Sequence, residues 1–163
     1  MKARIDVQKI AASRLRGMNA LKAQVEDSGL EPHLLHLVRM RASQINCCAY
    51  CLDMHWKDAR AAGESEQRLY GLDAWREAPY YSERERAALE WTEAVTRVSE
   101  GQVCDEVFEQ VHRHFGDEEL ADLTLAVVEI NAWNRIAISF RMPAGTYQPR
   151  GSRRVASEAR AAS

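Results

Sequence analysis

Two cysteines and a histidine occupy positions that a single helix would bring onto one face. Cys48, Cys51 and His55 are spaced at i, i+3 and i+7 in the segment CAYCLDMH. At about 100° per residue, these side chains fall within an arc of about 60° on an α-helix. Small and apolar residues share this arc, so we expect the thiols and the imidazole to face the protein interior or a pocket lined by it.

These residue types are suited to two-electron thiol chemistry. The reactive form of cysteine is the thiolate, so a working site must lower a cysteine pKa from about 8.5 toward neutrality. Cys48 begins the expected helix, where free N–H groups favour negative charge, and His55 lies one turn beyond Cys51, within reach of its proton. A sulfenic acid on Cys51 would condense with Cys48 into a disulfide. The spacing therefore predicts a redox-active dithiol.

Spacing alone leaves two other uses of this cluster open. A CxxC segment in a reducing compartment is typical of redox chemistry or of a zinc site, and isolated pairs also occur by chance. Structural zinc takes four ligands, and one helix cannot present Cys48, Cys51, His55 and a local fourth ligand without help. Cys47 is rotated about 100° from the shared face. Cys104 is distant in the sequence from the other three cysteines, and we expect it to serve as a small, buried apolar residue.

The composition argues against several other classes of function. The chain has 163 residues, a formal net charge of -2 and 28% charged residues, which gives no electrostatic basis for nucleic-acid binding. No segment reaches the roughly 20 apolar residues of a membrane span, and the first residues lack the apolar stretch of a signal peptide. The crowded cysteines also differ from a secreted disulfide scaffold. We therefore expect a cytoplasmic protein with no membrane or nucleic-acid partner.

Helical periodicity runs through most of the chain, and no segment shows the alternation of a β-strand. Ser82 and Glu85 form a capping box, and Gly63 is a typical helix C-cap. The sequence predicts an all-α bundle of about six or seven helices in one domain, 1–143, followed by a disordered tail, 144–163, rich in Gly, Ser, Ala and Arg. The expected helices span 6–28, 31–46, 48–62, 65–77, 82–98, 105–115 and 118–141.

The last expected helix is apolar on two sides. A small domain buries only one of these sides fully, so the other is expected to contact a second subunit in a homo-oligomer. Asn131 and Asn134 interrupt one apolar side, where buried amides must be hydrogen-bonded, so they either tie helices together or line the site. Glu129 and Arg135 are interpreted as an ion pair or as interface contacts rather than as catalysts.

The segment LHLVRMRASQINCCAYCLDMH, residues 35–55, together with the NAWNR stretch at 131–135, resembles the alkylhydroperoxidase AhpD-like family of the carboxymuconolactone decarboxylase-like superfamily. The resemblance covers about 30–143. It implies an all-helical fold that assembles into trimers or hexamers, and a dithiol that reduces small organic peroxides and is regenerated by an external dithiol. By position, Cys51 would be the peroxidatic cysteine, Cys48 the resolving cysteine and His55 the group that activates Cys51. We expect no bound cofactor or metal.

One position departs from the family pattern. Where well-studied members have a glutamate twelve residues before the first cysteine, this chain has His36. A histidine can also pass protons near neutral pH, so His36 is a candidate catalytic residue with a different pKa. Two rival functions remain: a decarboxylase-like lyase, which has no evident need for a CxxC pair, and a non-enzymatic oligomeric or zinc-binding protein.

Overall fold

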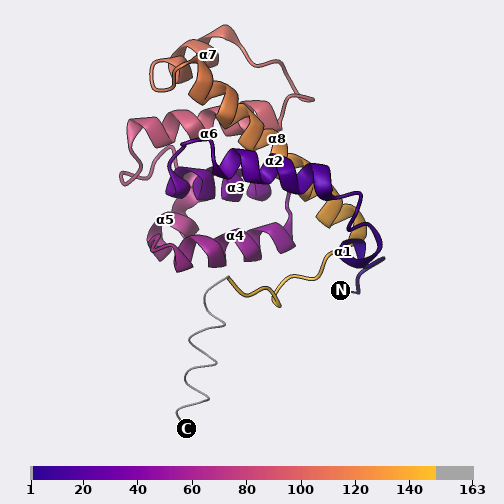
Figure 1. Cartoon of the computed structure of the whole chain (residues 1–163). Helices are drawn as coiled ribbons and strands as arrows, with labels where there is room; N and C mark the ends of the chain where they lie inside the picture. The colour runs from indigo at the N-terminus through magenta and orange to yellow at the C-terminus, as the bar shows by residue number, and fades with distance from the viewer. Residues whose placement is uncertain (1, 150–163) are drawn as a thin grey trace.

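The computed structural model describes residues 2–149, which form helices and contain no β-strand. The all-α fold class is therefore confirmed. Six helices have eight residues or more, joined by two short α-helices and one 3₁₀ helix (Figure 1). The elements are α1 (Val7–Ile10), α2 (Arg16–Glu26), α3 (Pro32–Ile45), α4 (Ala49–Ala61), α5 (Glu66–Tyr70), η1 (Gly71–Ala74), α6 (Glu83–Thr96), α7 (Asp105–His112) and α8 (Asp117–Phe140).

Helix α3 is the central element, because it packs against α4, α6 and α8. Nine of its 14 residues are buried, in agreement with a sequence that is apolar on more than one face. The long helix α8 crosses the molecule and also contacts α2, α4, α6 and α7 (Figure 1). A small apolar cluster of Ala42, Ile130 and Ala137 surrounds Cys48 and Cys51. The start of α4 is thus held between α3 and α8.

Local capping signals account for several helix ends. The Ser82 side chain accepts a hydrogen bond from the Glu85 backbone N–H, and the Glu85 side chain accepts one from the Ser82 N–H, which confirms the capping box of α6. Gly63, just beyond α4, has φ +95°, a conformation that suits glycine because it lacks Cβ. Its N–H donates to the Arg60 carbonyl, so the last turn of α4 is closed as expected.

The structure differs from the expected helices in two places. The segment 6–28 is divided into α1 and α2 by turns at 11–15, and the Arg4 N–H donates to the Phe140 carbonyl, which anchors the start of the chain to the end of α8. The segment 65–77 forms only the short helices α5 and η1. In addition, Cys104 is exposed at the N-terminus of α7, so its expected role as a buried apolar residue is wrong.

Residues 144–149, which the composition assigned to a disordered tail, lie against α4. The Gly145 N–H donates to Asp53 Oδ2 at 3.0 Å, and the Tyr147 hydroxyl bonds Asp58 Oδ1 at 2.7 Å. Lys57 Nζ also donates to the Tyr147 carbonyl at 3.1 Å. This part of the segment is packed on the domain because α4 offers it hydrogen-bonding partners. The remainder of the expected tail, 150–163, lies outside the described residues.

None of the helices in residues 2–149 has both the length and the apolar composition that crossing a membrane requires.

Candidate active site

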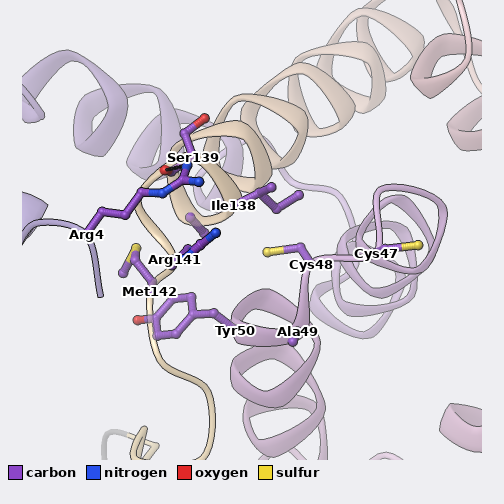
Figure 2. A pocket seen from close by; sticks show the side chains of 10 residues that line it. Arg4, Cys47, Cys48, Ala49, Tyr50, Ile138, Ser139, Arg141 and Met142 are labelled. Atoms are coloured by element: carbon purple, nitrogen blue, oxygen red, sulfur yellow. Dashed lines mark hydrogen bonds between the residues drawn. The ribbon is translucent and has the colours of Figure 1, made fainter. Parts of the chain in front are cut away.

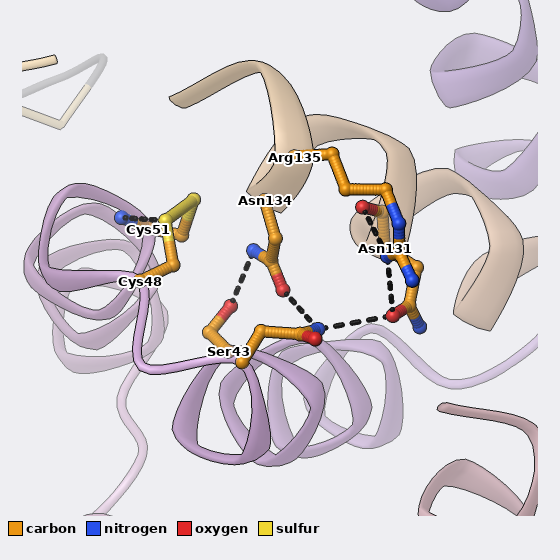
Figure 3. The surroundings of a disulfide bond; sticks show 7 residues. Ser43, Cys48, Cys51, Asn131, Asn134 and Arg135 are labelled. Carbon is orange, nitrogen blue, oxygen red and sulfur yellow. Dashed lines mark hydrogen bonds between the residues drawn. A yellow bond between two sulfur atoms is a disulfide. The ribbon is translucent and has the colours of Figure 1, made fainter. Parts of the chain in front are cut away.

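Cys48 and Cys51 are joined in a disulfide at the N-terminus of α4 (Figure 3). Their Cα atoms are 5.4 Å apart, and the two residues are 1% and 2% exposed. Cys48 precedes the helix with an extended backbone, and its Sγ accepts a hydrogen bond from the Cys51 N–H at 3.4 Å. The predicted pairing of the two cysteines is confirmed. The N–H groups of the first turn are also placed to stabilise a thiolate on Cys48 after reduction.

His55 lies in α4, four residues after Cys51, the spacing at which helical side chains become neighbours. It is only 5% exposed. Burial, reinforced by the positive charge of Arg39, holds its pKa well below the ordinary value of 6.5. The imidazole is therefore neutral near pH 7, the state in which it can accept a proton from a thiol.

A cavity of about 150 Å³ opens onto His55 between α2, α4 and α8. Lys22 from α2 and Glu129 and Trp133 from α8 also line it. Since these residues come from three helices that are far apart in the sequence, the cavity depends on the tertiary fold. It gives small molecules a route to the imidazole.

Glu129 is the residue whose importance the sequence understated. It is 1% exposed and accepts a hydrogen bond at 3.3 Å from Arg39 Nε on α3. Its ionic partner is therefore Arg39 and not Arg135, whose guanidinium donates to the Asn131 carbonyl and Oδ1 instead. Burial raises the pKa of the Glu129 carboxyl, and the Arg39 charge only partly opposes this effect. Arg39 itself is 4% exposed, and its Nη2 has no hydrogen-bond partner among the described residues. The only sequence signal was a lone carboxylate within the apolar stretch of α8.

His36 is placed differently from His55. It lies on α3, half-buried, and lines a separate cavity of about 250 Å³ together with Glu26 and Arg39. Its Nδ1 is buried with no hydrogen-bond partner among residues 2–149. Burial, followed by the Arg39 charge, lowers its pKa. A charge on His36 also lowers the pKa of His55, so the two rings interact electrostatically although they line different cavities.

The two asparagines of α8 tie helices together beside the disulfide, the first of the two roles considered for them (Figure 3). The Asn46 side chain donates to Asn131 Oδ1 at 3.0 Å and to Asn134 Oδ1 at 2.9 Å. Asn134 Nδ2 in turn donates to Ser43 Oγ at 3.1 Å. These bonds fix the end of α3, and with it the turn that leads to Cys48, against α8.

A third cavity, of about 530 Å³, lies at the start of α4 (Figure 2). Cys48, just before α4, and Tyr50, in α4, line it together with Arg141 and Met142, which follow α8. Figure 2 shows the Cys48 Sγ directed into the space and the Cys47 Sγ directed away from it. Cys47 is exposed and has φ +55°, so the chain turns sharply just before the disulfide.

The described residues contain no group of three or more His, Cys, Asp and Glu side chains arranged to hold a metal ion. The site therefore consists of a disulfide, a neutral imidazole and a buried Glu129–Arg39 pair.

Comparison with known sequences places this chain in a family. Residues 12–94 match the model of the carboxymuconolactone decarboxylase family. The uncharacterized protein YdfG of Bacillus subtilis is 40% identical over 139 residues, which cover 85% of this chain and 95% of YdfG. The uncharacterized protein YnjA of Escherichia coli is 33% identical over 118 residues, covering 72% of this chain and 64% of YnjA.

Solved structures agree with this assignment. ATU0492 of Agrobacterium tumefaciens, a protein of unknown function described as a putative antioxidant defence protein AhpD, superimposes with a TM-score of 0.86 and 44% identity, covering 90% of this chain and 100% of ATU0492. An uncharacterized peroxidase-related protein of Ralstonia eutropha with an alkylhydroperoxidase AhpD core has a TM-score of 0.73 at 22% identity over 83% of this chain and 72% of that protein, and shares the fold. The chain is therefore an AhpD-like member of the carboxymuconolactone decarboxylase family.

Proposed function

We propose that this protein is a thiol-dependent peroxidase that reduces small organic peroxides with the Cys48–Cys51 dithiol. The observation that carries the proposal is the pairing of the two cysteines at the start of a helix whose next turn presents a buried, neutral histidine. Family membership supports enzymatic activity in general. The specific reaction rests on the chemistry of these three side chains.

The proposed reaction begins with the reduced dithiol. His55 accepts the proton of the Cys51 thiol, and the resulting thiolate attacks the distal oxygen of the peroxide. The O–O bond breaks, Cys51 becomes a sulfenic acid, and the alkoxide leaves as an alcohol after taking up a proton. The Cys48 thiolate then attacks the sulfenic sulfur, which releases water and forms the disulfide. One peroxide thus consumes two thiols and yields an alcohol, water and a disulfide.

An external dithiol would return the disulfide to its reduced form, with its own oxidation balancing the two electrons. A reducing cytoplasm, the location expected from the cysteine spacing, would supply such a reductant. No bound cofactor or metal takes part in this scheme.

Protons must also move between His55 and solvent. Two groups are candidates for this step: His36, at the position of the family glutamate, and Glu129, which lines the same cavity as His55. We favour Glu129 for two reasons. Burial raises the pKa of its carboxyl, which therefore exchanges protons closer to neutral pH. Glu129 also lines the same cavity as His55, whereas His36 lines a different one.

Steady-state consumption of tert-butyl hydroperoxide, with dithiothreitol as reductant, tests the proposal. The Cys51→Ser and Cys48→Ser variants should both lose turnover, whereas Cys104→Ser, which changes an exposed cysteine at the start of α7, should retain it. Retained turnover in both of the first two variants would refute the dithiol as the catalytic group.

A further inference from the structure

The cavity at the start of α4 gives access to one sulfur of the disulfide and not to the other. Cys48 lines the cavity, whereas Cys51 does not. Cys48 is only 1% exposed, so a molecule that reacts with its sulfur has to enter the cavity rather than collide with an open surface. The volume of about 530 Å³ lies within the usual range for small-molecule sites, about 300–1,000 Å³.

The charges around this cavity have one sign. Arg4 and Arg141 line it, and none of the described residues that line it is a carboxylate (Figure 2). Arg4 is held in place because its Nη1 donates to the Ser139 carbonyl at 2.9 Å. Arg141 is exposed, and its guanidinium forms no hydrogen bond or ion pair with other described residues. The two arginine side chains therefore favour binding of an anionic ligand in this cavity.

The walls between the arginines and the sulfur are apolar or aromatic. Ile138 and Met142 from the end of α8 and Tyr50 from α4 line this part of the cavity. A short hydrocarbon chain would fit between them. The arrangement therefore matches a molecule with a reactive group at one end and an anionic group at the other.

We propose that this cavity binds one thiol end of the external reductant, a small molecule that also carries a carboxylate, and that this thiolate attacks Sγ of Cys48 rather than Sγ of Cys51. The proposal rests on the proposed function, since it identifies the reductant class for the same dithiol. The new S–S bond forms between the reductant and Cys48, the Cys48–Cys51 bond breaks, and the electron pair leaves on Cys51, which then takes up a proton. A second reductant thiolate attacks the mixed disulfide, releasing the oxidised reductant and the Cys48 thiolate.

This direction of attack gives each sulfur a suitable role. The Cys51 thiolate leaves beside His55, whose ring N–H can donate a hydrogen bond to it, and a stabilised thiolate is the better leaving group. The Cys48 thiolate, which is released second, accepts a hydrogen bond from the Cys51 N–H in the first turn of α4.

Reduction of the isolated disulfide form, in the absence of any peroxide, tests the proposal independently of peroxidase activity. The protein is oxidised with diamide, and its reduction by 3-mercaptopropionate, 2-mercaptoethanol or cysteamine is followed by stopped-flow fluorescence. Each rate constant is divided by the rate of the same thiol with a small model disulfide, which removes differences in intrinsic reactivity. The anionic thiol should be favoured over the cationic one by about tenfold at low salt, and less at high salt.

Variants of Arg141 and of a control arginine test whether the cavity causes the preference for the anionic thiol. Arg141→Gln should reduce the advantage of the anionic thiol by about two- to fivefold. Arg141→Glu should reverse the preference. The control, Arg113→Glu, changes an exposed arginine at the end of α7, outside the cavity, and should behave as the unchanged protein. Equal normalised rates for all three thiols would overturn the assigned ligand class. The same conclusion would follow if Arg113→Glu changed the preference as much as Arg141→Glu does.

Rapid acid quenching, alkylation of free thiols and peptide mass spectrometry locate the mixed disulfide. We expect 3-mercaptopropionate on Cys48 and the alkyl group on Cys51. The reverse distribution would overturn the assigned direction of attack, even if the protein proves to be an active peroxidase.

Discussion

At the scale of single residues, His55 is set apart by the way its surroundings keep it uncharged. Arg39 and His36 on α3 and Lys22 on α2 lower the pKa of His55, because their positive charges disfavour a positive charge on the His55 ring. Glu129, on α8, is the acidic group that lines the same cavity. A neutral ring beside Cys51 serves as a base over a wider pH range than an exposed histidine would, because it is not protonated near pH 6.5.

This low pKa predicts how stability depends on pH. Above pH 6.5 His55 is neutral in both the folded and the unfolded chain. As the pH falls below 6.5, the unfolded chain takes up a proton on His55 while the folded protein does not, so the free energy of unfolding should decrease toward the lowered pKa of the folded state. Urea denaturation at several pH values measures this effect. His55→Gln should show a flatter dependence in the same window. An unchanged slope would contradict the burial of a neutral His55.

The choice between Glu129 and His36 as the second proton carrier gives another prediction. Glu129→Gln should lower the turnover of peroxide by about tenfold or more, because the amide cannot exchange protons with His55. His36→Gln, in the neighbouring cavity, should have a smaller effect and mainly shift the acidic limb of the pH–rate profile. Glu129→Asp keeps the charge that Arg39 requires and should recover part of the loss. A larger loss in His36→Gln than in Glu129→Gln would assign the relay to the family position instead.

At the scale of helices, the Asn46, Asn131 and Asn134 side chains fix the turn before α4. Asn134 is fully buried and bonds both Asn46 and Ser43. Asn134→Ala would leave partners without a hydrogen bond and should destabilise the fold by about 1–3 kcal/mol. Chemical denaturation measures the loss, and the control is Gln110→Ala, which changes an exposed residue of α7. A destabilisation no larger than that of the control would mean that these bonds do not hold α3 to α8.

Sequence and structure agree best where a local signal decides the outcome. The capping box at Ser82 and the glycine at 63 predicted helix ends that the structure confirms, because both act within a few residues. The pairing of Cys48 and Cys51 followed from spacing for the same reason. By contrast, the bond that joins Arg4 to the end of α8 and the packing of 144–149 on α4 are tertiary contacts, which no local pattern encodes.

The same distinction applies to the site. The shared face of Cys48, Cys51 and His55 could be predicted from helical geometry alone. The cavity that joins Glu129 to His55 could not, because it brings α2, α4 and α8 together. The placement of His36 in a different cavity likewise depends on how α3 packs.

At the scale of the whole molecule, an apolar surface between α6 and α8 is left uncovered by residues 2–149. Val98 and Val128 are 61% and 47% exposed, and they line a shallow cavity of about 340 Å³ with Ala132. We propose that this surface contacts a second copy in a homo-oligomer, a trimer or a hexamer. Sedimentation velocity should show particles larger than one subunit, and Val128→Lys should shift them toward the monomer. A monomer at micromolar concentration in the unchanged protein would contradict this proposal.

Trapping a sulfenic acid on Cys51 tests most directly the central claim that Cys51 is the thiol that reacts with peroxide. Cys48→Ser removes the second thiol, so Cys51 should react once and remain oxidised. After one equivalent of tert-butyl hydroperoxide, dimedone should label Cys51, and peptide mass spectrometry should locate the label there. The Cys51→Ser variant should carry no dimedone on Cys48. Dimedone on Cys48 in that variant, together with continued consumption of peroxide, would contradict the account.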